Sequence, residues 1–204
     1  MAGIGLYGVY YSVATVEDGV VTGYNGAKTM GKAISASFTP NNPDENILYA
    51  NNSAAESDAS GASGGSLSLV LDRLKQDAAA DLFGLQVEDV SVTVEGSDAV
   101  TGKGLKFKGT EQSAPVGVAF IRQQQIDGSR DNHEVVLYRR ATFQMPTESA
   151  QTRGDTIEWQ TPEMSAAVVG MEGDGTKAWY EAIVFPTQAA AIAYIEQYFS
   201  AVGV

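Results

Sequence analysis

The sequence predicts a mainly β domain: an antiparallel β-sandwich or partly closed barrel, with a short helix near the middle and an amphipathic helix at the C-terminus. Three observations lead to this class. Short strand candidates recur between turn residues, the chain shows no βαβ alternation, and glycine is abundant, at 22 of 204 residues. A chain of this length can bury a core without disulfides, so we expect one domain over residues 1–204.

The N-terminal third has the pattern of paired strands. Residues 7–16 are rich in Tyr and Val and end at Asp18-Gly19, a turn pair typical of a hairpin. Residues 33–38 alternate Ile, Ala and Phe with Ser, and we expect the three apolar side chains on one buried face. This strand should stop at Pro40, which cannot donate a backbone hydrogen bond.

The rest of the chain alternates short strands with two helical segments. Residues 74–83 have a helical apolar stripe followed by Gly84, the residue expected just after a helix C-terminus. Residues 188–199 predict the second helix, with Thr187 as its N-cap. The remaining strand candidates are residues 66–72, 90–94, 105–107, 116–122, 135–144, 156–161, 164–169 and 179–185.

A long polar segment from Pro40 to Gly65 interrupts this order. We expect an extended loop, and connections of this length are more often functional or disordered than inert. Its apolar island is Ile47, Leu48 and Tyr49, which would be unusual on a free surface and would suit an anchor at a protein interface. The alternative is a loop that folds back over its own domain.

Composition disfavours several classes of function. The chain has no Cys and one His, which argues against thiolate chemistry, multi-His metal sites and most His-based proton relays. A net charge of −12 argues against tight nucleic-acid binding. No apolar run is long enough to span a membrane. We therefore expect no catalytic, cofactor-binding or metal-binding residues, and a protein that is not an enzyme.

Two short motifs resemble sites but lack essential residues. Residues 26–33, GAKTMGKA, approach a phosphate-binding loop, yet Ala33 has no hydroxyl for magnesium and the following residues predict a strand instead of a helix. The pair His133-Glu134 begins like a zinc-protease motif, but Leu137 stands where the second His should be. We expect a strand entrance at the first motif and an exposed hairpin His at the second.

The predicted hairpin of residues 135–144 and 156–161 has one apolar and one polar face. Ile157 and Trp159 are expected to pack on the core, whereas Thr156, Glu158 and Gln160 share the opposite face.

Four stretches in order carry a resemblance to one protein family. They span nearly the whole chain and read GLYGVYYSVAT; GKAISASFTPNN with LYANNSAAESDAS and GGSLSLVLDRLKQDAAADLFG; VGVAFIRQQ with VLYRRATFQMPTESAQTRGDTIEWQTPEMSAAVV; and WYEAIVFPTQAAAIAYI. The run PTESAQTRGDTIEWQTP is the most specific part. Together they resemble the major tail protein, or tail tube protein, of long-tailed, siphovirus-type bacteriophages. The likeness is weaker between Val87 and Gln112.

The resemblance implies a virion structural protein that self-assembles into hexameric rings. Such rings stack into the tail tube, through which the viral genome passes during ejection. The implied partners are other copies of the chain, the tape measure protein, and the tail terminator and tail-tip proteins, with DNA only in transit and no membrane. The implied locations are the phage tail of the virion and, during assembly, the host cytoplasm.

Within such a tube the candidate residues would have defined roles. Ile47, Leu48 and Tyr49 would anchor one ring to the next, and the face of Thr156, Glu158 and Gln160 would line the lumen or contact a neighbouring subunit. An acidic lumen would suit DNA that has to slide, because Lys and Arg contacts would hold it.

A non-catalytic carbohydrate- or peptide-binding β-sandwich is the alternative. Tyr10, Tyr11, Trp179 and Tyr180 could supply the exposed aromatic rings that such a module uses. Their positions within strand patterns favour core or interface roles instead.

Overall fold

The computed structural model describes residues 2–42, 46–50, 53–58, 61–96, 98–126, 128–148, 150–152, 159–170 and 178–200. The predicted fold class is confirmed: the protein is mainly β, its sheets are antiparallel, and two helices include one at the C-terminal end. The main sheet is not closed, which agrees with a sandwich. No helix in these ranges is both long and apolar enough to cross a membrane.

The order of elements follows the sequence pattern closely. The two helices are α1 (Gln76–Phe83) and α2 (Gln188–Ser200). The strands are β1 (Ala2–Glu17), β2 (Val20–Tyr24), β3 (Lys28–Gly31), β4 (Ala33–Pro40), β5 (Asn46–Ala50), β6 (Ser53–Asp58), β7 (Gly64–Leu71), β8 (Gln86–Val92), β9 (Val100–Lys106), β10 (Pro115–Ile126), β11 (Ser129–Phe143), β12 (Glu163–Val169) and β13 (Tyr180–Phe185).

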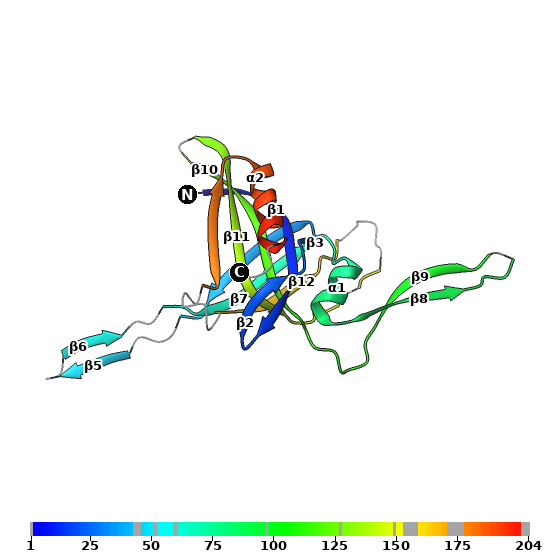
Figure 1. Ribbon diagram of the computed structural model, residues 1–204, viewed down its shortest axis with the longest axis horizontal. Helices are drawn as coiled ribbons and strands as arrows, with labels where there is room; N and C mark the ends of the chain where they lie inside the picture. Colours follow the sequence, from blue (N-terminus) through cyan, green and yellow to red (C-terminus); the bar gives the residue numbers. More distant parts are fainter. Residues whose placement is uncertain are drawn as a thin grey trace.

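Nine strands form one sheet, and two hairpins stand outside it. The main path runs β2-β1-β10-β11-β12-β7-β4, with β3 on β1 and β13 on β11. The strands β5 and β6 pair only with each other, as do β8 and β9. In Figure 1 these two hairpins extend from opposite sides of the body.

The long strand β11 is shared between two parts of the sheet. Its residues 133–138 pair with β13, and its residues 141–143 pair with β12. The partner therefore changes at Arg139 and Arg140, where the β10–β11 register also shifts. This change lets β12, β7 and β4 turn over the sheet of β1, β10 and β11, and the main core contains buried residues from both layers.

The helix α2 covers the outer face of the layer that contains β10, β11 and β13. Its Ala191, Ile195 and Phe199 are buried against a second apolar cluster. The approach is close at Gly117, where an added Cβ would lie 2.5 Å from Phe199 Cε1. Burial raises the pKa of Tyr198 to about 12.

Several local predictions are confirmed in detail. The turn after β1 has positive φ at Asp18 (49°) and Gly19 (83°), as a type I′ hairpin requires. Gly84 ends α1 in the left-handed conformation, at φ 65°. The Thr187 hydroxyl accepts the Ala190 N–H at 3.2 Å and caps α2.

The predicted burial of Ile34 is wrong. A register shift between Ala33 and Ser35 places an extra residue in β4, and the Ile34 side chain is 53% exposed. Beyond that bulge the alternation holds, because Ala36 and Phe38 pack against the core.

We expect the ion pair beside the β11 partner change to hold β13 against β11. Arg139 Nη2 lies 2.6 Å from Glu181 Oε1 of β13, and both side chains are largely buried. The substitution Glu181→Gln keeps the size of the side chain but removes a negative charge beside the Arg139 guanidinium, and should lower the free energy of unfolding by roughly 1–3 kcal/mol. Urea denaturation, followed by circular dichroism, measures this change in the free energy of unfolding.

The matched control is Glu163→Gln on β12. Among the described residues, this exposed carboxylate accepts one hydrogen bond, from the Ser68 hydroxyl at 3.1 Å, so the substitution should change the free energy of unfolding by no more than about 0.5 kcal/mol. Equal effects of the two substitutions would contradict a special role for the Arg139–Glu181 pair.

Candidate interaction surfaces

The β8–β9 hairpin is a two-stranded arm that carries exposed apolar side chains. We call residues 86–106 the β8–β9 arm. Its strands pair in register from Gln86 with Lys106 to Val92 with Val100. Apart from its base beside α1, the arm projects from the body in Figure 1. Isolated two-stranded hairpins are marginally stable in water, so such an arm gains most from a contact that covers it.

The two faces of the arm differ in chemistry. On one face Ser91 Oγ and Thr101 Oγ1 share a hydrogen bond of 2.8 Å. Residues alternate between faces, so Val90, Val92 and Val100 share the other face, where they are 47%, 57% and 59% exposed. Three exposed valines in one stripe form a surface that another protein chain can cover.

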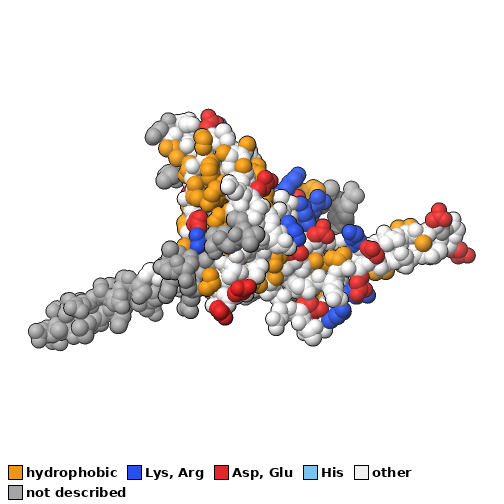
Figure 2. Space-filling model, in the orientation of Figure 1, with side chains coloured by type: hydrophobic (Ala, Val, Ile, Leu, Met, Phe, Trp, Pro, Cys, Tyr) orange, Lys and Arg blue, Asp and Glu red, His pale blue; other side chains and the backbone are white. Residues whose placement is uncertain are grey.

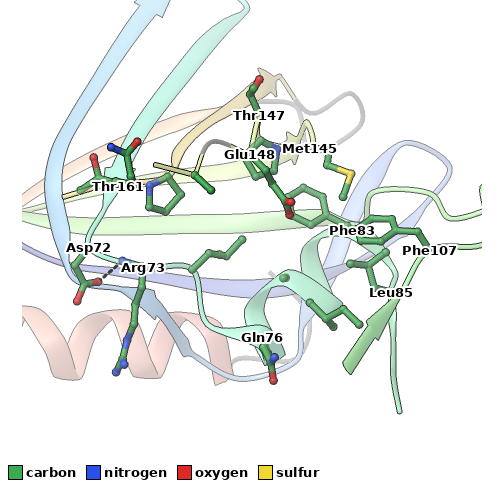
Figure 3. Close-up of a pocket in the computed structure, with 17 residues that line it drawn as sticks. Asp72, Arg73, Gln76, Phe83, Leu85, Phe107, Met145, Thr147, Glu148 and Thr161 are labelled. Atoms are coloured by element: carbon green, nitrogen blue, oxygen red, sulfur yellow. Dashed lines mark hydrogen bonds between the residues drawn. The ribbon is translucent and has the colours of Figure 1, made fainter. Parts of the chain in front are cut away.

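A pocket of about 480 Å³ lies at the base of this arm, against α1 (Figure 3). Phe83 and Leu85 form buried apolar walls, and Phe107 and Met145 are half exposed at its side. Its polar lining includes Asp72, Arg73, Gln76, Glu148 and Gln160. The pocket thus joins an apolar wall to a polar rim, a composition suited to holding a side chain from another segment.

An aromatic groove of about 690 Å³ crosses the other end of the body. Phe38 and Trp179 stack with ring centroids 5.1 Å apart, and Trp179 Nε1 donates to Ala62 O at 3.0 Å. Tyr138 and Tyr180 continue this lining. The rings pack against one another, so much of their area is already covered.

The aromatic residues considered for ligand binding do not form one platform. Tyr11 is buried and its hydroxyl donates to Asp81 Oδ2 at 2.8 Å. Tyr10 packs beside α2, whereas Trp179 and Tyr180 lie at the groove. The preference for core or interface roles is confirmed for Tyr11.

The pair His133-Glu134 lies buried in β11, so the prediction of an exposed His is wrong. His133 is 8% exposed, and its ring centroid lies 6.2 Å from that of Tyr7. Glu134 Oε2 accepts Arg122 Nε at 2.9 Å and Gln124 Nε2 at 2.5 Å. The carboxylate is held by these two donors, which favours a structural ion pair.

The other motif forms the predicted strand entrance. In GAKTMGKA, β3 and β4 take up residues 28–31 and 33–40, so no helix N-terminus follows the glycines. Among the described ranges, no group of three or more His, Cys, Asp or Glu could hold a metal ion.

The predicted anchor residues Ile47, Leu48 and Tyr49 lie in β5. They pair with Ser57, Glu56 and Ala54 of β6, so the segment 40–65 contains a hairpin where the sequence suggested an extended loop. This β5–β6 arm has no pairing with the main sheet. The location agrees with a projecting element.

The predicted polar face is only partly within the described residues. Thr156 and Glu158 lie outside them, as does Ile157. Gln160 is exposed, is not in a strand, and donates to Gln151 Oε1 at 3.2 Å. The expectation that Trp159 packs on the core is wrong, since its side chain is 83% exposed.

Sequence reasoning did not assign a role to the β8–β9 arm. The segment lies where the resemblance is weakest, and its valines look like those of any half-buried strand. The available signal was the alternation of Val90 and Val92 with polar residues, together with the glycines at 102 and 104. Val90 pairs with Gly102 and Val92 with Val100, so the stripe has few side chains within the arm to cover it.

Comparison with known protein families gives no match, and no curated protein is similar to the chain in sequence. The function is therefore argued from the surfaces above together with the resemblance in sequence.

We expect the exposed valines of the arm to contribute to association and little to folding. Replacing Val92 and Val100 together by Thr keeps β-branched side chains in the strands, so the free energy of unfolding should change by less than about 0.5 kcal/mol. Sedimentation velocity should show weaker self-association, because apolar contact area is lost.

The core substitution Val136→Thr provides the contrast. Val136 is 1% exposed, so a buried hydroxyl there should cost about 1–3 kcal/mol of stability. If Val92→Thr with Val100→Thr destabilised the fold as much, the valines would belong to the core.

Proposed function

We propose that this chain is a virion structural protein, the tail tube subunit of a siphovirus-type bacteriophage. Its copies form hexameric rings, and the rings stack into a conduit for the genome during ejection. The proposal includes no catalytic residue, cofactor or metal. It places the protein in the phage tail, after assembly in the host cytoplasm with the tape measure, tail terminator and tail-tip proteins.

The observation that carries this proposal is the pair of projecting arms on one sandwich. Both arms form sheets of their own outside the main sheet, and the β8–β9 arm exposes a stripe of valines. A stable body with partly uncovered arms is suited to a subunit that neighbouring copies complete. Head-to-tail contacts of this kind continue into a filament.

The charge of the chain fits a conduit for DNA. Its net charge of −12 gives little affinity for phosphates, and a tube wall must let the genome slide. Exposed Gln160 and the neighbouring Glu158 remain the proposed lumen or subunit-interface face, together with Thr156.

The aromatic groove favours one other candidate, a non-catalytic carbohydrate- or peptide-binding module. Phe38, Trp179 and Tyr180 line a groove that could accept a sugar ring or an extended peptide. Such a module would remain small at all concentrations, so self-assembly separates the two functions.

Negative-stain electron microscopy over a concentration series, beside size-exclusion chromatography with light scattering, tests the proposal. We expect hollow rings or tubes at high protein concentration. If the protein stays monomeric, purified tail components should recruit it into tubes. A chain that joins no tube in either experiment would favour the binding module.

We expect the β5–β6 arm to act in stacking and not in folding. Deleting Asn42 to Ser60 removes a hairpin that pairs with no strand of the main sheet, so the melting temperature should stay close to that of the intact chain. Because the arm is proposed to join one ring to the next, the variant should form rings at most. Long tubes of the deletion variant in electron micrographs would contradict the stacking role.

A further inference from the structure

Three of the thirteen basic residues of this acidic chain surround one pocket. Lys32 follows β3, and Arg73 and Lys75 lie between β7 and α1. With residues 6–8 of β1 they line a pocket of about 490 Å³, which we call the basic pocket. Figure 2 shows Lys and Arg side chains gathered on this part of the body.

Backbone contacts fix the spacing of these cations. Asp72 Oδ1 accepts the N–H groups of Lys32 and Arg73, both at 2.8 Å, and the Asp72 N–H donates to Lys32 O at 2.9 Å. The Lys32 N–H is the main reason that the pKa of Asp72 lies below its ordinary value. Gly31 permits the approach, since an added Cβ would lie 2.3 Å from Arg73 O.

Among the described residues that line the pocket, the three cations outnumber the one carboxylate, that of Asp72. Lys28, beside the pocket, is paired with Asp81 at 2.7 Å. Among the described residues, no carboxylate forms a salt bridge with Lys32, Arg73 or Lys75, and all three side chains are exposed. An acidic group from another molecule could therefore pair with them.

The far end of the β8–β9 arm has the opposite charge. Glu95 and Asp98 lie in its turn, next to the exposed Val94. Figure 2 shows acidic side chains at this end of the arm. Seven residues of strand reach about 23 Å, which carries these carboxylates well away from their own body.

We propose that the β8–β9 arm of one copy docks on a second copy, with Glu95 and Asp98 in the basic pocket. The valine stripe supplies apolar area beside the ion pairs, and the opposite charges favour this orientation between chains that repel each other overall. The contact joins two different surfaces, so it repeats from copy to copy. This inference rests on the proposed self-assembly and names the surfaces that produce it.

Charge reversal on each surface tests the pairing. The pocket variant carries Lys32→Glu and Arg73→Glu, the arm variant carries Glu95→Lys and Asp98→Lys, and a third variant carries all four. Sedimentation velocity at low salt should show self-association weakened about tenfold or more in either double variant and largely restored in the third. Melting temperatures check that all variants fold.

A matched control reverses charges elsewhere. Arg130→Glu with Asp131→Lys changes two exposed residues at the start of β11, and should leave association unchanged. The proposed docking is wrong if the variant with all four substitutions self-associates as weakly as the double variants. It is also wrong if the control substitutions weaken self-association equally.

Mixing the two double variants separates this inference from the tube proposal. In the mixture, the acidic arm of the pocket variant can meet the basic pocket of the arm variant. The basic arm of the arm variant can likewise meet the acidic pocket of the pocket variant. The two variants should therefore associate with each other more strongly than either associates with itself. Wild-type tubes with no association in the mixture would overturn the docking and keep the tube function. Association in the mixture, with no wild-type tubes either alone or with purified tail components, would keep the docking and remove the tube function.

A fluorescent single-stranded oligonucleotide tests the other occupant of a basic pocket. If the pocket receives the arm, the oligonucleotide should bind wild-type protein no more tightly than it binds the pocket variant. Oligonucleotide binding that depends on Lys32 and Arg73, with self-association unaffected by either reversal, would assign the pocket to phosphates instead and overturn the proposal.

Discussion

The architecture depends on how β11 exchanges one neighbour for another at Arg139 and Arg140. Hydrogen bonds converge there: Tyr24 donates to Arg139 O at 2.8 Å, and Arg140 Nη1 donates to Gly19 O at 2.9 Å. The Arg139 side chain binds Glu181 across the two strands. A sheet that continued flat would leave one face of β11 exposed, whereas the change of partner folds β12, β7 and β4 over the core.

The fold class and most elements could be predicted because they depend on local pattern. Alternation, turn pairs and caps are properties of neighbouring residues, and they located α1, α2 and the β1–β2 turn. Ile34, His133 and Trp159 could not be placed in this way. Ile34 sits in a bulge set by the pairing of Ala33 with Leu71 and of Ser35 with Val70, and the other two depend on which segment covers them.

The candidate surfaces were less predictable than the fold for the same reason. The residues of β5 proposed as an anchor were visible as an apolar island within a polar segment. The basic pocket was not, because Lys32 and Arg73 are distant in sequence and meet only through Asp72 and the close approach at Gly31. A cluster of charges that comes from two separate loops, between β3 and β4 and between β7 and α1, leaves no pattern in the sequence. The exposure of the valine stripe is equally hidden, because its alternation is the same as that of a buried strand.

The separation of both arms from the nine-stranded sheet has a consequence for spacing. Lengthening a hairpin that pairs only with itself leaves the register of every core strand unchanged, and loop closure becomes costlier by only about 0.6 kcal/mol for each doubling of length. In the proposed assembly, insertions and deletions in the arms would therefore alter the distance between adjoining molecules in small steps. Related chains could keep this sandwich and differ chiefly in the repeat distance between copies along such a tube.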